Sequence, residues 1–188
     1  PSKNMSACSS SLSVHSPVLI KNPSKNNYII NGTPSDCVHI ASKGLLKKLP
    51  DIVFSGINFG SNLGDDVIYS GTVAGAIEGR CCKYSPISIS IASREPKFLS
   101  DIEEKINFIL SHIFKQEYKY KNIFNINIPD IPYKKIKGIK YTLLGSRKTA
   151  LNPIIKKSNN KIFDKIGPVG NPVKSNKSTD FNAIKSNF

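Results

Sequence analysis

The chain has 188 residues, of which 39% are apolar, and this is enough for one substantial hydrophobic core. No apolar run approaches the roughly 20 residues that cross a bilayer, so the sequence predicts no membrane-spanning helix and no membrane partner. The net charge is +14, and residues 101–188 hold 17 of the 27 basic residues but only 7 of the 13 acidic ones.

This basic excess permits a nucleic-acid or polyphosphate-binding protein. However, no recognised nucleic-acid motif accompanies it, and the aromatic residues do not interleave with the basic ones as a base-stacking platform requires. We therefore expect solvated lysine faces with a general attraction for anions, and this pattern disfavours nucleic acid as a partner. The cysteines show no Cys-x-x-Cys spacing, which favours reduced thiols in a cytoplasmic protein; they are Cys8, Cys37, Cys81 and Cys82.

The N-terminal region predicts a strand pair. An open α/β domain normally begins with a core strand, but a polar segment opens this chain, so we expect a strand upstream of Pro1. Leu12–Ile20 and Asn27–Ile30 are predicted to pair, with a break at Lys21–Pro23 and a loop to Asn27.

A helix is predicted to begin after Thr33. Thr33 fits the N-cap, Pro34 fits the first helical position, and Asp36 stands where a capping box places its acidic residue. The apolar pattern then runs on until Leu49 and Pro50 end the helix.

The stretch from Pro50 to Gly79 predicts a strand, a loop and a helix in that order. Ile52–Phe54 is too short for a helix and is typical of a buried strand. Residues 55–66 are dense in Gly, Asn, Ser and Asp, and an apolar helix begins at Ser70-Gly71-Thr72. This order builds a ligand site at the carboxyl edge of an open sheet, and so many polar groups favour a functional loop over a plain connection.

Pro86–Ile91 and Ile123–Ile128 alternate apolar and polar residues and predict two further strands, with Lys140–Leu144 as another candidate. Between the first two, Ser100 is predicted to cap a helix together with Glu103. The buried stripe of that helix is predicted to be Ile102, Ile106, Ile109, Leu110, Ile113 and Phe114.

Strands that alternate with helices predict an α/β fold. Beyond Gly145 the pattern fades into Lys, Asn, Pro and Gly, which predicts an extended hairpin segment that needs a neighbour such as a partner subunit. No terminating element precedes Phe188, so we expect the C-terminus to be cut.

The residues by themselves predict a phosphate-handling site, with or without a metal. Asn58 offers a carbonyl oxygen and Ser6 a hydroxyl to a hard cation, whereas the adjacency of Asp65 and Asp66 is weak support for a metal pair. Phosphate suits Asn62 and the helix start at Ser70-Gly71-Thr72. No Ser-His-Asp set can be assembled, because the three histidines lie outside the polar loop.

Several stretches resemble the SurE family, the stationary-phase survival nucleotidases. The longest is SGINFGSNLGDDVIYSGTVAGAIEG at residues 55–79. Shorter matches are GTPSDCV at 32–38, NINIP at 125–129 and STDF at 178–181. The resemblance extends over nearly the whole chain.

This resemblance implies a metal-dependent phosphatase that hydrolyses nucleoside 5′-monophosphates. It also implies a Rossmann-like open sheet with helices on both faces, and subunits that exchange C-terminal segments in a homodimer or homotetramer. We expect residues 1–145 to form the α/β nucleotidase core and residues 146–188 to form the extended, subunit-exchanging tail.

The family pattern assigns roles residue by residue. Ser6, Asn58 and an Asp-Asp pair expected upstream of Pro1 would hold one divalent cation, Mg²⁺ or Mn²⁺, although Ala7 replaces a glycine of the pattern. The phosphate-side residues are Asn62, Ser70, Gly71 and Thr72. Asp65 and Asp66 are expected to shape the loop instead of binding metal.

Three alternatives stay open at this point. Without the Asp-Asp pair, we expect the 188-residue piece to be inactive and the complete gene product to be active. A pseudoenzyme would bind nucleotide without cleaving it. A basic polyanion-binding protein would bind nucleic acid or polyphosphate without turnover.

Overall fold

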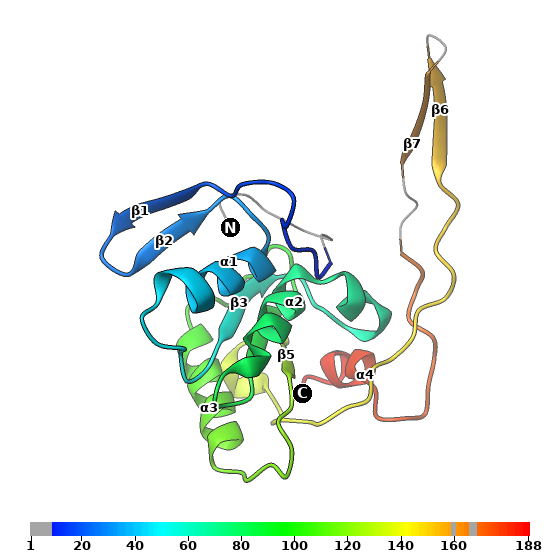
Figure 1. Ribbon diagram of the computed structural model, residues 1–188. Helices are drawn as coiled ribbons and strands as arrows, with labels where there is room; N and C mark the ends of the chain where they lie inside the picture. Colours follow the sequence, from blue (N-terminus) through cyan, green and yellow to red (C-terminus); the bar gives the residue numbers. More distant parts are fainter. Residues whose placement is uncertain (1–8, 159–160, 166–168) are drawn as a thin grey trace.

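A parallel sheet of three strands forms the centre of the protein (Figure 1). The structure is a computed structural model, and it describes residues 9–158, 161–165 and 169–188. The sheet order is β3-β4-β5, with β3 at Phe54–Phe59, β4 at Ile87–Ile91 and β5 at Phe124–Ile128. The strands predicted from alternating residues are confirmed, and the fold is α/β.

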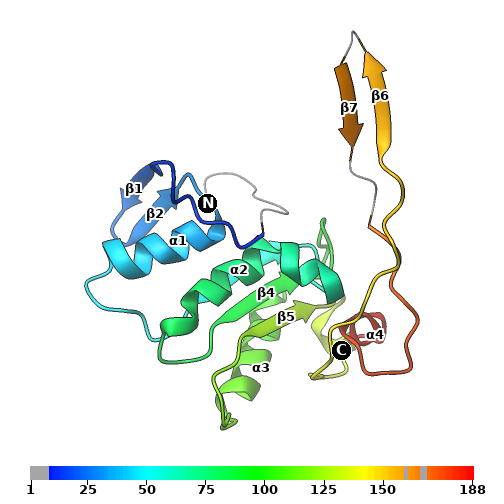
Figure 2. The same cartoon turned by 45° about the vertical axis from the view of Figure 1, so that its right-hand side comes forward.

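Helices cover both faces of the sheet, as expected (Figure 2). Helices α1 (Pro34–Ile40) and α2 (Gly71–Glu78) pack against each other on one face. Helix α3 (Ile102–Phe114) lies on the other face. This is the Rossmann-like open arrangement that the sequence predicted.

The two faces of β4 differ in side-chain size. Ile87 and Ile89 pack with Ile113 of α3 and Ile128 of β5, and together they form the hydrophobic core. The serines of β4, which alternate with these isoleucines, point toward the opposite face and are fully buried. Small side chains on that face let α2 lie close to the sheet.

Gly75 marks a close approach of α2 to its neighbours. A Cβ at this position would lie 2.7 Å from the Ser55 hydroxyl oxygen and 3.3 Å from Cβ of Pro34. Any larger residue would push α2 away from β3 and α1. This packing fixes the position of the α2 N-terminus, on which the functional site depends.

The start of α1 is as predicted, but its end is not. Thr33 accepts a hydrogen bond from the backbone N–H of Asp36, and the Asp36 carboxylate accepts one from the backbone N–H of Thr33, which completes the capping box. The helix continues as a π-helical turn at Ala41–Leu45 and ends there, before the predicted stop at Leu49.

The strand boundary before the polar loop was predicted too early. Residues 55–59 are part of β3, although most of their side chains are small or polar and suggested a loop, whereas Ile52 and Val53, predicted in the strand, precede it. The strand is also mostly exposed and not buried as predicted. The pairing register with β4 shifts between Ser55 and Asn58, so β3 carries a bulge at Gly56-Ile57. The bulge allows a strand to form from a sequence that lacks regular alternation.

The N-terminal pair also has other bounds. Strands β1 (Ile20–Ser24) and β2 (Asn27–Ile30) form an antiparallel hairpin that is separate from the main sheet. Pro23, expected to break the strand, lies in β1, because a two-stranded hairpin has free edges that tolerate proline. Most of Leu12–Ile20 is therefore not a strand.

The prediction for α3 was wrong by one residue at its start. Asp101 is the N-cap residue, not Ser100, and no side chain caps the helix. The Asp101 carboxylate instead pairs with Lys105 at 2.5 Å and accepts a hydrogen bond from the backbone N–H of Tyr133. Phe114, predicted in the buried stripe, is 55% exposed, whereas Lys105 is buried.

The C-terminal part contains a projecting hairpin. Strands β6 (Ile154–Ser158) and β7 (Lys161–Lys165) pair with each other only and extend away from the body (Figure 1). The extended hairpin segment is thus confirmed. Lys140–Leu144 is not a strand, since only Leu143 forms an isolated bridge, and helix α4 (Asp180–Lys185) was not predicted.

The helices and the cysteines of the described ranges bear on two expectations from composition. None of the helices in these ranges has the length and apolar content needed to cross a bilayer. Cys37, Cys81 and Cys82 are free thiols. Burial raises the pKa of the Cys82 thiol. Cys8 lies outside the described residues.

The capping box predicts a pH dependence of stability. Burial alone would raise the pKa of Asp36, but hydrogen bonds from Ser13 and Thr33 outweigh it and hold the pKa below its ordinary value. The stabilisation is therefore complete above the unfolded-state pKa of about 3.9 and is lost as the pH falls through the lower folded-state pKa. We expect Asp36→Asn to lower the free energy of unfolding at pH 7 by about 0.5–2 kcal/mol.

Thermal unfolding between pH 2 and pH 7 measures this effect. The curve for Asp36→Asn should converge on the wild-type curve at low pH. Asp51→Asn, at an exposed carboxylate, is the matched control and should follow the wild type throughout. A constant gap between Asp36→Asn and wild type down to pH 2 would contradict the role of the ionised carboxylate.

Candidate functional site

The candidate site lies where β3 ends and α2 begins. The connection between them contains a 3₁₀ helix at Gly64–Tyr69 and leads into Ser70, the N-cap of α2. Because the strands are parallel, the carboxyl ends of β3, β4 and β5 meet at this edge, where open α/β sheets bind ligands. The edge therefore brings polar residues from several segments together.

Asn58 stands in β3, one residue before its end, and is half-buried. Its side-chain Nδ2 donates to the carbonyl oxygen of Gly60 at 2.6 Å. Within the described residues, Oδ1 of Asn58 accepts no hydrogen bond. The carbonyl oxygen of this amide is of the kind that a hard cation prefers as a ligand.

Asn62 is held from several directions and is only 8% exposed. Its side-chain Nδ2 donates to Oγ of Ser90 at 2.7 Å, and its backbone N–H donates to Oδ1 of Asn127 at 2.8 Å. Its carbonyl oxygen accepts hydrogen bonds from Nδ2 of Asn125 and Nδ2 of Asn127, at 2.8 and 3.0 Å. Asn125 and Asn127 of β5 therefore fix the backbone of the loop at Asn62, and Ser90 of β4 fixes its side chain.

The first turn of α2 presents the predicted phosphate-side residues. Oγ of Ser70 accepts a hydrogen bond from the backbone N–H of Val73 at 3.1 Å, so Ser70 is a true N-cap. Gly71 is buried and Thr72 is half-buried at the helix start. The first N–H groups of a helix have no intrahelical partner, and together with the helix dipole they favour an anion.

Ser6 lies outside the described residues. The first contact that the structure describes for this segment is made by Ser9. Its backbone N–H donates to the carbonyl oxygen of Tyr69 at 3.1 Å, and its Oγ donates to that of Ile68 at 2.9 Å. The N-terminal segment thus reaches the residues that immediately precede Ser70.

Asp65 and Asp66 bind Arg147. The backbone N–H of Arg147 donates to Oδ2 of Asp65 at 2.7 Å, and its guanidinium donates to both carboxylate oxygens of Asp66 at 2.5–2.9 Å. These carboxylates shape the loop, as the sequence analysis expected. No three His, Cys, Asp or Glu side chains gather as a metal cluster anywhere in the described ranges.

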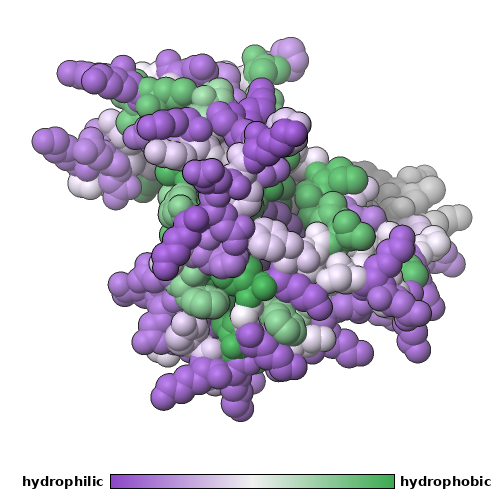
Figure 3. Space-filling view, turned by 90° about the horizontal axis from the view of Figure 1, so that it is seen from below, coloured by the Kyte–Doolittle hydropathy of each residue, from purple (hydrophilic) through white to green (hydrophobic). Residues whose placement is uncertain are grey.

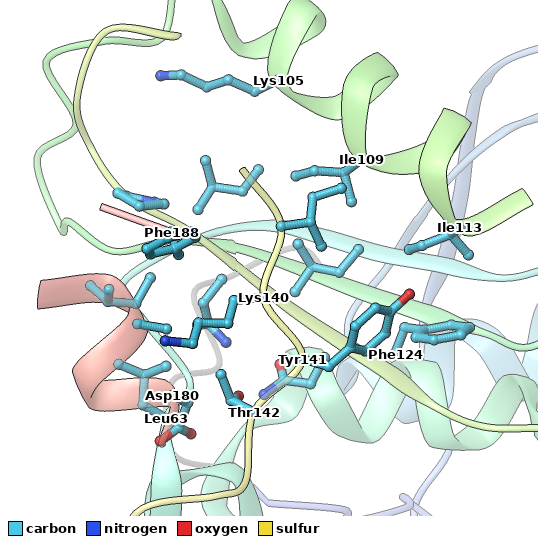
Figure 4. A pocket seen from close by; sticks show the side chains of 18 of the residues that line it. Leu63, Lys105, Ile109, Ile113, Phe124, Lys140, Tyr141, Thr142, Asp180 and Phe188 are labelled. Atoms are coloured by element: carbon cyan, nitrogen blue, oxygen red, sulfur yellow. The ribbon is translucent and has the colours of Figure 1, made fainter. Parts of the chain in front are cut away.

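A cavity of about 490 Å³ lies beside this edge but has a different character (Figure 4). Side chains of α3, β5 and residues 136–144 line it, and they are mostly apolar. Burial and a hydrogen bond with Tyr118 raise the pKa of Tyr141, on its wall, to about 12, so this phenol stays neutral. Asn58, Asn62, Ser70 and Thr72 do not line the cavity. A mostly apolar cavity is a poor phosphate site, so we place the candidate site at the helix start.

Several residues that build the site were missed from the sequence. Asn125 and Asn127 were quoted as a family block without a role, although their spacing of two in a strand indicates that both point to one face. Ser90 and Arg147 were not singled out. Asp180 was quoted only as part of a block, and its signal was weak because it lies 116 residues from its partner Gly64.

The comparisons with known proteins all point to one family. A family model described as "Survival protein SurE" matches residues 1–151. The chain is 43% identical to "5'-nucleotidase SurE" of Vesicomyosocius okutanii subsp. Calyptogena okutanii (strain HA), over 100% of this chain and 75% of that protein. It is 44% identical to "5'/3'-nucleotidase SurE" of Wigglesworthia glossinidia brevipalpis, with the same coverage of both proteins.

A solved structure gives the same result for the fold. The crystal structure of the SurE protein from Aquifex aeolicus superposes with a TM-score of 0.81 at 32% sequence identity. The match covers 99% of this chain and 76% of that chain. On the family model, the sequence identities and the shared fold together, the chain belongs to the SurE family.

Proposed function

We propose that this protein is a metal-dependent phosphatase that hydrolyses nucleoside 5′-monophosphates to nucleoside and phosphate. The observation that carries the proposal is that Asn58, Asn62 and the first turn of α2 lie at one sheet edge in a chain whose relatives are named nucleotidases. A phosphate at the helix start would lie next to a cation held at the end of β3.

The cation is Mg²⁺ or Mn²⁺, with Oδ1 of Asn58 and the hydroxyl of Ser6 among its ligands. The fit rests on donor chemistry, since Nδ2 of Asn58 is committed to Gly60 and its oxygen is the remaining ligand atom. When bound, such a cation polarises phosphoryl oxygens and lowers the pKa of a bound water. Asp65 and Asp66 are not in this set, because Asp66 already forms an ion pair with the Arg147 guanidinium and Asp65 already accepts the backbone N–H of Arg147.

The first turn of α2 binds the phosphoryl group. Backbone N–H groups of Gly71 and Thr72, with the Thr72 hydroxyl, would donate to the phosphoryl oxygens and stabilise the added negative charge in the transition state. Asn62 is assigned to the phosphate-binding residues. Its buried side chain bonds Ser90 and thereby holds the loop in position next to the bound phosphate. No residue of the described ranges is assigned as the catalytic base.

The proposed assembly is a homodimer or homotetramer in the cytoplasm. A two-stranded hairpin is marginally stable alone in water, so β6 and β7 would gain stability from contact with a neighbouring subunit. We keep the proposed division into a core at residues 1–145 and a subunit-exchanging tail at 146–188. Within this tail the hairpin is the part that would contact the partner subunit, because Arg147 and Asp180 bind the loop of their own chain.

Binding of nucleic acid without turnover is the competing function. On the face drawn in Figure 3, hydrophilic residues dominate and apolar residues form separate patches. Several lysines lie over aromatic rings of their own segments, as Lys83 does over Tyr84 and Lys119 over Tyr120. Both lysines are exposed, which supports solvated lysine faces.

A substrate panel tests the proposed function. The full-length gene product should release phosphate from nucleoside 5′-monophosphates in the presence of Mg²⁺ or Mn²⁺, and a chelator should abolish the release. Nucleotide binding without release would instead identify a pseudoenzyme. RNA or polyphosphate binding that weakens steeply with salt, without any turnover, would identify the polyanion-binding alternative.

The metal assignment predicts a specific variant effect. Asn58→Ala removes a ligand oxygen, so metal affinity and phosphate release should both fall by at least about tenfold. The matched control is Asn122→Ala, because Nδ2 of Asn122 also donates to a carbonyl oxygen two residues away, that of Tyr120. Asn122 precedes β5 and so lies at the opposite edge of the sheet. Titration of activity with Mn²⁺ measures both variants, and an unchanged metal demand in Asn58→Ala would contradict the assignment.

The helix start predicts two separable effects. Ser70→Ala removes the N-cap acceptor, so it should lower the free energy of unfolding by about 1 kcal/mol as well as reduce activity. Thr72→Val keeps the shape of the side chain and should leave stability within about 0.5 kcal/mol. It should still reduce kcat by about 10²-fold, because it removes a donor to the transition state. Denaturant unfolding and steady-state kinetics on both variants check this, and normal kcat in Thr72→Val excludes the hydroxyl from the site.

A further inference from the structure

We propose that Asp180 and Arg147 are positioning residues for phosphate binding, a proposal that rests on the nucleotidase function above. Both residues lie in the C-terminal part of the chain, on either side of the segment that carries β6 and β7. Together they hold Gly64, Asp65 and Asp66, which we call the anchored tripeptide. This tripeptide stands between Asn62 and Ser70 of the proposed site.

Asp180 makes the deepest of these contacts. Its side chain is buried, with 7% exposure of the residue. Oδ2 accepts a hydrogen bond from the backbone N–H of Gly64 at 2.6 Å. Oδ1 accepts hydrogen bonds from the backbone N–H groups of Gly145 and Phe181, at 2.9 and 2.8 Å. A buried carboxylate that accepts three such bonds is fixed in position, since losing any partner leaves charge uncompensated.

The backbones of the two segments also touch. Gly64 has a φ of +53°, and a Cβ there would lie 2.5 Å from the carbonyl oxygen of Gly145 and from the ring of Phe181. Only glycine adopts this left-handed conformation without strain and also lets Gly145 and Phe181 approach the backbone so closely. With no side chain between the segments, a shift of residues 145–147 moves the loop directly.

Arg147 holds the next two residues of the anchored tripeptide. Its backbone N–H bonds Asp65, and its guanidinium forms a fork with the carboxylate of Asp66. The guanidinium carbon lies 4.8 Å from the centre of the Phe181 ring, and Nη1 donates to the carbonyl oxygen of Gly170. The Arg147 side chain is therefore held by the Phe181 ring, by Gly170 and by Asp66. Because its position is fixed, it can support the loop at Asp65 and Asp66.

The position of the anchored tripeptide connects these contacts with phosphate binding. Two residues before it, the strand ends hold Asn62. The tripeptide is itself the first half of the 3₁₀ helix Gly64–Tyr69, which leads directly to Ser70, and the backbone N–H of Ser70 donates to the carbonyl oxygen of Val67. A short helix transmits displacement, so a shift at Gly64 would tilt the first turn of α2 and its N–H groups.

A merely structural role would lower stability without changing the chemistry of the folded protein. The test therefore compares kinetics with stability on the full-length protein for Asp180→Asn, Arg147→Ala and Arg147→Lys. Asp180→Asn places an amide N–H₂ against backbone N–H groups, whereas Arg147→Lys keeps the charge and loses the fork. Asp101→Asn is the control, at another largely buried carboxylate that accepts a backbone N–H bond but lies at α3.

Each variant is assayed well below its own Tm for kcat and KM with a nucleoside 5′-monophosphate. Binding of inorganic phosphate is measured in parallel by calorimetry. We expect Asp180→Asn and Arg147→Ala to lower kcat/KM and phosphate affinity by about tenfold or more, with partial recovery in Arg147→Lys. Asp101→Asn should lower Tm but keep kcat/KM and phosphate affinity within about twofold.

The proposal is overturned if Asp180→Asn and Arg147→Ala keep wild-type kcat/KM and phosphate affinity at any Tm. If Asp180→Asn does not fold, the two Arg147 variants decide the outcome by the same criteria. If the wild-type protein binds phosphate without turnover, the nucleotidase function alone is refuted. The phosphate affinities of Asp180→Asn and Arg147→Ala, compared with wild type, would then test whether these residues position the phosphate site. Wild-type protein that neither binds phosphate nor turns over would refute both.

Discussion

The buried carboxylate of Asp180 is the constraint on which the arrangement of loop and tail depends. A charge taken out of water is costly unless its oxygens are hydrogen-bonded, and here the backbone N–H groups of Gly64, Gly145 and Phe181 provide those bonds. The three donors come from the loop after β3, the segment before the hairpin and the start of α4. The carboxylate is therefore satisfied only when all three segments are in place.

A second constraint acts from the opposite side of the same loop. The β4 face toward α2 carries serines in place of large residues, and the helix meets it with glycine and alanine, so helix and sheet lie close. On the loop side, Ser90, Asn125 and Asn127 form a polar network of hydrogen bonds with Asn62. Loop and helix start are thus fixed between strand ends and tail, which is the pre-organisation that anion binding requires.

The molecule separates polar chemistry from apolar packing. The helix start and Asn58 lie at the polar edge, whereas the cavity beside β5 is mostly apolar (Figure 4). Most of the basic excess falls in residues 101–188, and a positive field of this kind draws anionic ligands to the protein without fixing where they bind. The binding position is set instead by backbone N–H groups and amide side chains at the edge.

The sequence by itself determined the elements whose signals are local. The capping box at Thr33, the helix start at Ser70-Gly71-Thr72 and the alternation of β4 and β5 were all predicted, because each depends on neighbours a few residues away. Only the tertiary structure decided features that depend on distant partners. The bulge in β3 and the bonds of Asp180 and Arg147 to the loop arise between segments up to 116 residues apart, and no local pattern encodes such pairings.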